Sequence, residues 1–421
     1  MGDGRSRPPL HQVTRRLLWT RGLRSIGQGA LVVAFVLYLK DLHWTAASIG
    51  LLLMVGTIAG AALSLAVGPI SDRYGRRRFL LIYQAALVVG TAALMADRAG
   101  WVLVVTSALL GYGRGLNGAA GPFAPAEQAW LAQAVPRAER ARIFSLNGAV
   151  GFWGMGVGSL IAAAVPLWRQ WLPGASAYEP LFALTALIGL LNYVQISGLR
   201  EQAAAPLPPA VDAAADAPAA DALQRRENVA LAALFGINAV NALGVGLFAP
   251  LLPYWLAVRF GVGAGSIGSV FGVSLLLTGA ASIANGMAAE RYGLVRTVVW
   301  MRLAGVALLA LLPLAPTYGW AATLYFVRSL LNRGALGAQQ AFSVGLVRDR
   351  RRGLASSLNA ASFGLPSAIG PAIAGQMIDA GALDLPFFLA AALQLTYAVL
   401  FGTVLASLVP RGVDADEADL P

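Results

Sequence analysis

The chain has 421 residues, of which 57% are hydrophobic and 12% charged, and its mean hydropathy is +0.66. Soluble domains carry about 25% charged residues, so this composition excludes an ordinary soluble domain. The net charge is +11 and Lys40 is the only lysine, while the lack of cysteine excludes disulfides, a thiol nucleophile and a thiolate metal site.

Twelve apolar runs are each long enough for the ~20 residues that a membrane-spanning helix needs. In chain order they are residues 17–39, 46–70, 79–97, 101–134, 143–166, 178–198, 228–257, 264–288, 296–316, 319–346, 353–377 and 384–408. The fourth, seventh and tenth are too long for one straight crossing, so we expect part of each to project beyond the hydrocarbon. The runs predict an all-α membrane protein with twelve transmembrane helices.

The twelve runs divide into two sets of six. Residues 17–199 and 228–408 are each predicted to form a six-helix bundle. Residues 200–227 join them and are rich in Ala, Pro and Asp, which predicts a flexible cytoplasmic linker. Residues 1–16 and 409–421 are polar and predict cytoplasmic tails.

The loop after the second run recurs in the second half of the chain. Gly68-Pro-Ile-Ser-Asp-Arg-Tyr-Gly-Arg-Arg-Arg78 and Gly286-Met-Ala-Ala-Glu-Arg-Tyr-Gly-Leu-Val-Arg296 share Gly, an acid, Arg-Tyr-Gly and a final Arg, at an offset of 286 − 68 = 218. Ser48-Ile49-Gly50 matches Ser266-Ile267-Gly268 at the same offset. A repeat of this length predicts a transporter built from two pseudo-symmetric halves.

Basic residues predict the orientation of the bundles. If the N-terminus lies inside, the inner loops and tails hold twenty-one arginines, whereas the outer loops hold only Lys40, Arg98, Arg169 and Arg259. This positive-inside bias predicts that both termini are cytoplasmic. It also explains the pI near 10.5 without a nucleic-acid partner, because the arginines fall in short loops between apolar runs.

The repeated loop resembles the best-known motif of the major facilitator superfamily, Gly-x-x-x-Asp-Arg-x-Gly-Arg-Arg/Lys. It matches at Gly68, Asp72, Arg73, Gly75, Arg76 and Arg77. A second family motif, Arg-x-x-Gln-Gly, is matched in the fourth run by Arg114 and Asn117, with Asn in place of Gln. The resemblance covers nearly the whole chain. It implies a multi-pass secondary transporter of the bacterial inner membrane, similar to drug/proton antiporters.

The resemblance also implies that the loop motif latches the two bundles on the cytoplasmic side. Independently of the family, Asp72 ends a helix and can accept hydrogen bonds from a neighbouring helix N-terminus, while Gly75 permits a tight turn. The alternative role for the loop arginines is to set topology alone. The second-half copy of this gate comprises Gly286, Glu290, Arg291, Gly293 and Arg296.

One segment departs from the family pattern. Relatives often carry Asp-x-Val-Pro after the fourth span as a partner for the loop arginine, but here the segment reads Gln133-Ala-Val-Pro136. The latch is then expected to use Glu127 or backbone oxygens.

Glu127 is the only carboxylate that we place well inside a span. An acid buried in a membrane is costly and usually functional, so one interpretation is that Glu127 takes up and releases a proton during transport. The other interpretation is a fixed salt bridge with Arg76 or Arg114 that keeps the carboxylate ionised. The sequence leaves both open.

Polar residues in the first, fourth, seventh and tenth spans are candidates for a substrate cavity, because these spans line the central cavity in the superfamily. They are Arg24, Gln28, Arg114, Asn117, Asn238, Asn241, Arg328 and Asn332. An excess of arginine over one acid favours an anionic substrate. Alternatively, each arginine binds backbone carbonyls or Glu127.

We therefore expect a secondary transporter that works by rocker-switch alternating access and exports a small organic or amphiphilic compound in exchange for protons. The antiporter motif Gly-Pro-x-x-Gly-Gly is degraded in span five, which reads Gly158-Ser-Leu-Ile-Ala-Ala163, but Gly370-Pro371 remains in span eleven. Two alternatives stay open: a uniporter or symporter that imports a polar or anionic nutrient, and a non-transporting receptor with the same fold. No enzyme activity, cofactor or metal is expected. The expected state is a monomer in the lipid bilayer, with a small-molecule substrate and protons as partners.

Overall fold

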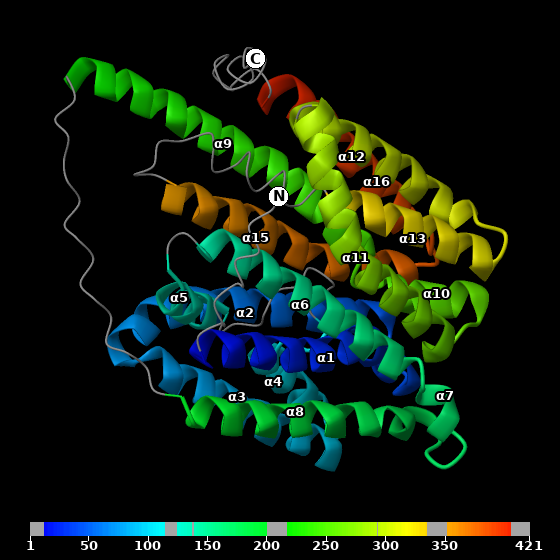
Figure 1. The fold of residues 1–421 in the computed structure, drawn as a ribbon. Helices are drawn as coiled ribbons and strands as arrows, with labels where there is room; N and C mark the ends of the chain where they lie inside the picture. The colour runs from blue at the N-terminus through cyan, green and yellow to red at the C-terminus, as the bar shows by residue number, and fades with distance from the viewer. Residues whose placement is uncertain are drawn as a thin grey trace, which may run out of the picture.

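The computed structural model describes residues 12–113, 124–136, 139–199, 217–292, 294–334 and 352–405. All regular secondary structure in these ranges is helical. The helices form two bundles that lie against each other, which we call the first bundle (residues 12–199) and the second bundle (residues 217–405) (Figure 1).

The described helices of the first bundle are α1 Gln12–Asp41, α2 Ala46–Tyr74, α3 Arg76–Ala96, α4 Gly100–Leu110, α5 Ala124–Ala134, α6 Arg140–Ala162, α7 Val165–Trp168 and α8 Glu179–Ser197. Those of the second bundle are α9 Ala217–Phe248, α10 Leu252–Phe260, α11 Ala264–Tyr292, α12 Leu294–Leu311, α13 Tyr318–Gly334, α15 Arg352–Asp379 and α16 Leu385–Leu400, which continues into a π-helical turn at Phe401–Leu405. Each predicted span overlaps one of these helices or a consecutive pair. Seven of the described helical segments are long and apolar enough to cross a membrane on their own, and three shorter apolar helices add to them. The predicted all-α membrane fold is therefore confirmed.

The helix boundaries reproduce the repeat found in the sequence. Helices α2 and α11 begin and end at the same offset, 264 − 46 = 218 and 292 − 74 = 218. Helices α6 and α15 begin at the offset 352 − 140 = 212. The two halves are thus pseudo-symmetric in structure as well as in sequence.

The fourth span is two helices and not one. Helix α4 ends at Leu110 because Gly111 and Gly113 adopt the left-handed backbone, with φ of 79° and 72°, which glycine reaches at little cost. The N–H of Gly111 donates to the carbonyl of Ser107 (3.0 Å) and closes the helix end. Helix α5 then begins at Ala124, and the residues between 113 and 124 lie outside the described part of the chain.

The linker also differs from the prediction. Helix α9 begins at Ala217, so the last eleven residues of the expected flexible segment 200–227 are helical. The Ala-rich stretch 217–222 has high helix propensity and extends the helix of the seventh span toward its N-terminus. Residues 200–216 lie outside the described part of the chain.

Two pairs of helices hold the bundles together. We call the end of the molecule at the α2–α3 turn the motif end and the opposite end the far end. Helix α2 packs on α15, and α6 packs on α11. A Cβ added to Gly50 would overlap the carbonyl oxygen of Pro371, and one added to Gly268 would lie 2.7 Å from the carbonyl oxygen of Ser159. The backbones of the two bundles therefore touch near the far end, as small residues allow in membrane helices, while toward the motif end the described helices diverge (Figure 1).

Helix α1 lies at the centre of the first bundle. Every residue from Ala30 to Leu39 is buried, and α1 contacts α5, α6 and α8 of its own bundle as well as α10 and α11 of the second. A helix that is apolar all round belongs inside a larger assembly. The position of α1 places its polar first half, which includes Arg24, in the interior of the molecule.

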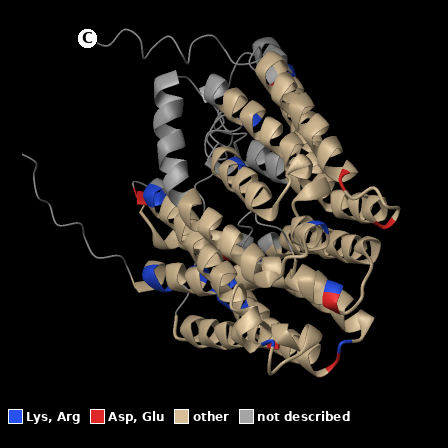
Figure 2. Cartoon of the chain, turned by 90° about the vertical axis from the view of Figure 1, so that its right-hand side faces the viewer, with Lys and Arg blue, Asp and Glu red and all other residues tan. Residues whose placement is uncertain are grey.

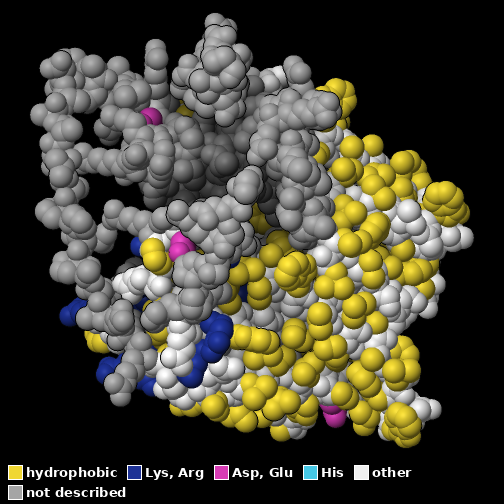
Figure 3. All heavy atoms as spheres, viewed as in Figure 1, with side chains coloured by type: hydrophobic (Ala, Val, Ile, Leu, Met, Phe, Trp, Pro, Cys, Tyr) yellow, Lys and Arg dark blue, Asp and Glu magenta, His cyan; other side chains and the backbone are white. Residues whose placement is uncertain are grey.

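The outer surface is apolar and suits a lipid environment. Hydrophobic side chains cover much of the described surface in Figure 3, and Leu65, Val89 and Val194 are 77%, 68% and 61% exposed. Charged residues are few along the helices of both bundles (Figure 2). Basic side chains gather at the left edge of Figure 3, where the motif end lies. Apolar side chains exposed to this extent would promote association in water, whereas in a bilayer they contact lipid.

Candidate functional site

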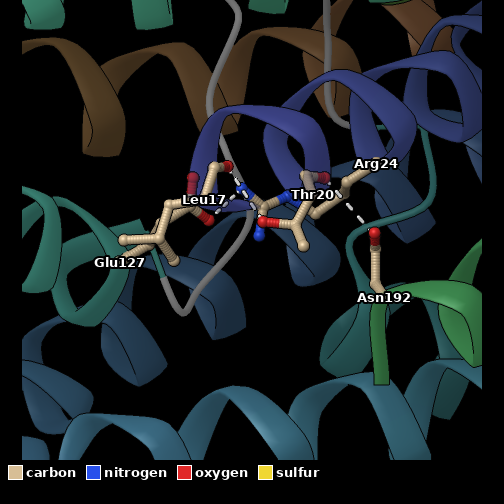
Figure 4. Close-up of polar contacts among 5 residues, drawn as sticks. All are labelled: Leu17, Thr20, Arg24, Glu127 and Asn192. Atoms are coloured by element: carbon tan, nitrogen blue, oxygen red, sulfur yellow. Dashed lines mark hydrogen bonds and ion pairs between the residues drawn. The ribbon is translucent and has the colours of Figure 1, made fainter. Parts of the chain in front are cut away.

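Glu127 and Arg24 form an ion pair inside the first bundle (Figure 4). Glu127 lies in the first turn of α5, where the helix N-terminus favours an anion, and Arg24 lies in the polar half of α1. Arg24 Nη2 donates to Glu127 Oε2, and each side chain is only 3% exposed. The sequence indicated Arg76 or Arg114 for a fixed salt bridge with Glu127, and it placed Arg24 only among the cavity arginines that alternatively bind backbone carbonyls or Glu127.

Arg21 adds a second positive charge beside this pair. It precedes Arg24 by one helical turn, is 5% exposed and interacts electrostatically with both Arg24 and Glu127. A Cβ added to Gly151 would lie 2.7 Å from Arg21 Nη2, so the guanidinium packs directly against α6. With Glu127 ionised, the three side chains carry a net charge of +2 − 1 = +1, and a proton on Glu127 would raise it to +2.

Asn192 connects α8 to α1 next to the ion pair. Its Nδ2 donates to the carbonyl of Thr20 (3.4 Å), and Thr20 Oγ1 donates to the carbonyl of Leu17 (2.9 Å) (Figure 4). Asn192 is fully buried, and its Oδ1 accepts no hydrogen bond within the described structure.

Arg24 also lines a cavity within the first bundle. Gln28, Tyr83, Tyr112 and Thr185 contribute polar side chains to its wall. Residues 111–113, which form the left-handed break after α4, also line the cavity. Non-helical backbone is tolerated in a membrane where it lines a cavity or is buried in protein. The break in the fourth span therefore forms part of the wall of this cavity.

Among the described side chains of the second bundle, two buried arginines have amide and aromatic partners. Arg328 is 6% exposed, its Nη2 donates to Gln394 Oε1 (2.8 Å), and its guanidinium lies 4.3 Å from the ring centre of Phe248. The cation–π geometry suits a guanidinium that is removed from water.

Arg302 is the second buried arginine of this bundle. It is 5% exposed, its Nη1 donates to Asn332 Oδ1 (3.1 Å), and it lies 5.5 Å from the ring centre of Tyr397. Asn332 Nδ2 donates in turn to the carbonyl of Arg328 (3.3 Å). Asn332 therefore joins the two arginines into one polar cluster.

Replacing Asn332 with leucine should destabilise the second bundle. The change removes the acceptor of Arg302 Nη1 and puts an apolar group in its place, which costs about 1–3 kcal/mol. We expect a lower melting temperature of the purified protein in detergent. Thr323→Leu, at an exposed position of the same helix, is the matched control and should change stability by no more than about 0.5 kcal/mol. Equal losses in the two variants would contradict the role of Asn332.

Three buried amides were not found by sequence reasoning. Gln84, Asn192 and Gln394 lie on α3, α8 and α16 and are at most 2% exposed. Gln84 is the repeat equivalent of Arg302, because 302 − 84 = 218. The signal in the sequence is a single polar residue within an apolar span, which is unusual in a membrane helix.

The motif loop has the predicted tight turn. Gly75 separates α2 from α3 with φ of 95°, and its N–H donates to the carbonyl of Ser71 (2.9 Å). Arg77 Nη2 donates to the carbonyl of Ser197 (2.6 Å) at the C-terminus of α8, where a positive charge is favoured. Arg77 therefore fastens the start of α3 to the end of α8 within the first bundle.

The remaining predicted site residues divide into described and undescribed ones. Asn238 and Asn241 are both buried on α9, Arg73 is exposed and Arg76 is half-buried. Arg114, Asn117 and Gly293 lie outside the described structure. The surroundings of Gly68 and Gly286 and the side chains of Asp72, Glu290, Arg291 and Arg296 are also outside it. The described members of the predicted cavity thus include one group around Arg24 and one around Arg328. Within the described ranges, no cluster of three or more His, Asp or Glu is placed to hold a metal ion.

These features define a class of protein. Two pseudo-symmetric helical bundles with an apolar outer surface, charged side chains in their interiors and backbone contact near one end form the architecture of a secondary transporter. Such a protein moves small molecules across a membrane and is not an enzyme.

Comparison with known proteins identifies the family. The model of the Major Facilitator Superfamily matches residues 17–237 and 234–419, and the chain belongs to this superfamily. An uncharacterised membrane protein of Saccharomyces cerevisiae is 24% identical over 332 residues, which cover 72% of this chain and 74% of the relative.

Solved structures show the same fold. A mutant of the nucleoside transporter NupG superposes with a TM-score of 0.72 at 11% identity, over 94% of this chain and 100% of the other. A D-xylose–proton symporter superposes with a TM-score of 0.69 at 13% identity, over 94% of this chain and 98% of the other.

Proposed function

We propose that this transporter is proton-coupled and that Glu127 is its proton site, with Arg24 as the counter-ion. The observation that carries the proposal is the buried ion pair between α1 and α5, both of whose side chains are 3% exposed. Ionisable groups inside a membrane are expensive and mark proton or substrate pathways. The name of the similar D-xylose–proton symporter is consistent with proton coupling in this fold.

A proton on Glu127 changes the balance of charge around Arg24. The neutral acid no longer compensates the guanidinium, and the group of Arg21, Arg24 and Glu127 goes from +1 to +2. A buried charge that has lost its partner is strongly destabilised. Exposing Arg24 to water or binding a compensating anionic group would then stabilise the first bundle. Protonation of Glu127 is thereby linked to a change in the conformation of the transporter.

The first form of the proposal is export of a small organic or amphiphilic compound in exchange for protons. A site that becomes more positive on protonation repels a cationic compound. Proton binding and substrate binding then oppose each other, which is the condition for exchange.

The second form is import of a polar or anionic nutrient together with a proton. An anionic group compensates Arg24 once Glu127 is protonated, so proton and substrate bind together. The names of the nucleoside transporter and the D-xylose–proton symporter favour polar substrates of this kind. The charge of the substrate therefore decides between the two forms.

The proposed setting is the inner membrane of a bacterium, with the motif end and both termini in the cytoplasm. Contact between the bundles near the far end corresponds in this orientation to a state open toward the cytoplasm. Rocking of the two bundles would close the motif end around Asp72 and the loop arginines. The polar groups around Arg24 and Arg328 would then line the two sides of the substrate path.

Flux into proteoliposomes tests the coupling. Purified protein is reconstituted, a pH gradient is imposed, and uptake of labelled cationic, neutral and anionic compounds is measured with and without an uncoupler. Accumulation that requires the gradient supports proton coupling, and its direction relative to the gradient separates exchange from symport. Flux that does not depend on the pH gradient would exclude proton coupling, and binding without any flux would favour a receptor.

A further inference from the structure

The far end contains a contact between the bundles that the proposed proton site does not explain. Asp379 is the last residue of α15 and belongs to the second bundle, whereas Ala46 and Ala47 begin α2 in the first bundle. The N–H of Ala46 donates to Asp379 Oδ1 (3.0 Å), and that of Ala47 donates to Asp379 Oδ2 (2.9 Å). Both carboxylate oxygens thus hold a helix end of the other bundle.

The contact completes the N-terminal cap of α2. The first N–H groups of a helix have no acceptor within the helix and carry partial positive charge. Thr45 Oγ1 accepts from the N–H of Ser48 (3.2 Å), and Asp379 accepts from the two preceding residues. When the bundles separate at the far end, α2 keeps its own cap but loses the two hydrogen bonds to Asp379.

Next to this contact, helices α2 and α15 pack against each other in antiparallel orientation. A Cβ added to Gly375 would overlap the carbonyl oxygen of Ala46, and one added to Gly50 would overlap that of Pro371. The two pairs have the same sum of residue numbers, 46 + 375 = 421 and 50 + 371 = 421.

The arrangement on the α2–α15 pair has no copy on its pseudo-symmetric counterpart, the α6–α11 pair. The offset of 212 maps Asp379 onto position 167, which is Leu167 (379 − 212 = 167). Leu167 is 68% exposed and cannot cap a helix. The cap by Asp379 is therefore a feature of one pair of helices and not a general consequence of the duplicated fold.

We propose that Asp379 is the latch of the far end, which holds the two bundles together there by capping α2 and is released when that end opens. The family resemblance implies a latch around Asp72 at the motif end, and Asp379 would serve the far end in the same way. Rocking would break the contact of Asp379 when the far end opens. The inference concerns the conformational cycle and does not depend on proton coupling at Glu127.

The size of the effect follows from the environment of Asp379. The residue is exposed, so water screens the interaction and competes for the same N–H groups. Loss of a cap of this kind shifts a conformational equilibrium by about three- to tenfold. The far end would therefore open several times more often without Asp379, while both bundles remain folded.

Distances between spin labels on the two bundles test the proposal. The chain contains no cysteine, so Q170C after α7 and V258C on α10, both at exposed far-end positions, introduce a single label pair. Pulsed electron paramagnetic resonance is recorded in nanodiscs without substrate. D379A should increase the long-distance population by about three- to tenfold relative to the parent pair, and D379N, which keeps one acceptor oxygen, should give a smaller increase.

Asp384→Ala is the matched control. Asp384 is also an aspartate of the far end, but it accepts from Trp255 Nε1 (3.0 Å) within the second bundle. Its removal should leave the distance distribution unchanged. An unchanged distribution in both D379A and D379N would overturn the latch, and so would an equal increase in D384A. Because no transport is measured, these outcomes are independent of whether the proposed proton coupling holds.

Discussion

Glu127→Gln is expected to abolish transport driven by a pH gradient while sparing exchange of substrate across the membrane. The amide resembles the protonated acid in shape and charge and cannot release a proton. Its oxygen can still accept the hydrogen bond from Arg24 Nη2, while the guanidinium loses its counter-charge as it does when Glu127 is protonated. Gradient-driven uptake and substrate counterflow in the same proteoliposomes measure the two activities.

A second acid offers the matched control for this prediction. Glu179 pairs with Arg98 at the rim of the first bundle, where the side chains are 30% and 39% exposed. Exposed ion pairs contribute about 0–1 kcal/mol, so Glu179→Gln should leave flux and stability close to those of the parent. Unchanged gradient-driven transport in Glu127→Gln would remove Glu127 from the coupling mechanism.

Stability measurements on variants of Arg24 and Glu127 test whether these two side chains interact directly. Removing one partner of a buried ion pair costs about 3–5 kcal/mol, and Arg24→Gln leaves the carboxylate without its counter-ion. The double variant Arg24→Gln with Glu127→Gln leaves two neutral amides. We expect the double variant to be more stable than the sum of the single losses predicts, which is the signature of directly interacting residues.

The repeat and the span count could be predicted because each rests on many residues. An offset of 218 is fixed by whole segments, and α2 and α11 reproduce it at both ends. Likewise, about 20 apolar residues in a row have few structures available to them other than a membrane helix. Errors in single residues do not change either conclusion.

Interior contacts could not be predicted in the same way. The sequence marked Glu127 as unusual and placed Arg24 near the cavity, but choosing between Arg24, Arg76 and Arg114 as the partner requires the rotation of α1 and α5 about their axes. The break after Leu110 escaped notice because glycine is frequent in membrane helices that pack closely. Only the backbone angles of Gly111 and Gly113 show that the helix ends there.

The largest effect on folding is expected from Gly158→Val. Gly158 lies on α6, and a Cβ at this position would overlap the carbonyl oxygen of Ile26 on α1. Both helices belong to the first bundle, so the clash is relieved only by separating helices of one core. Overpacking of a core costs typically about 1–3 kcal/mol, and a clash with rigid backbone lies at or above the upper limit. We expect a large fall in the yield and melting temperature of the purified protein.

Gly50→Val presents the same local clash at a different kind of contact. A Cβ on Gly50 meets the carbonyl oxygen of Pro371 across the two bundles, and the bundles can part while the helices within each bundle stay packed. This variant should keep a melting temperature near that of the parent but lose transport, because the far end can no longer close. Gly236→Val, with nothing within 4 Å of the added Cβ, should change neither the melting temperature nor transport. If Gly50→Val lost as much stability as Gly158→Val, the α2–α15 contact would be part of a fixed core and could not serve as a moving gate.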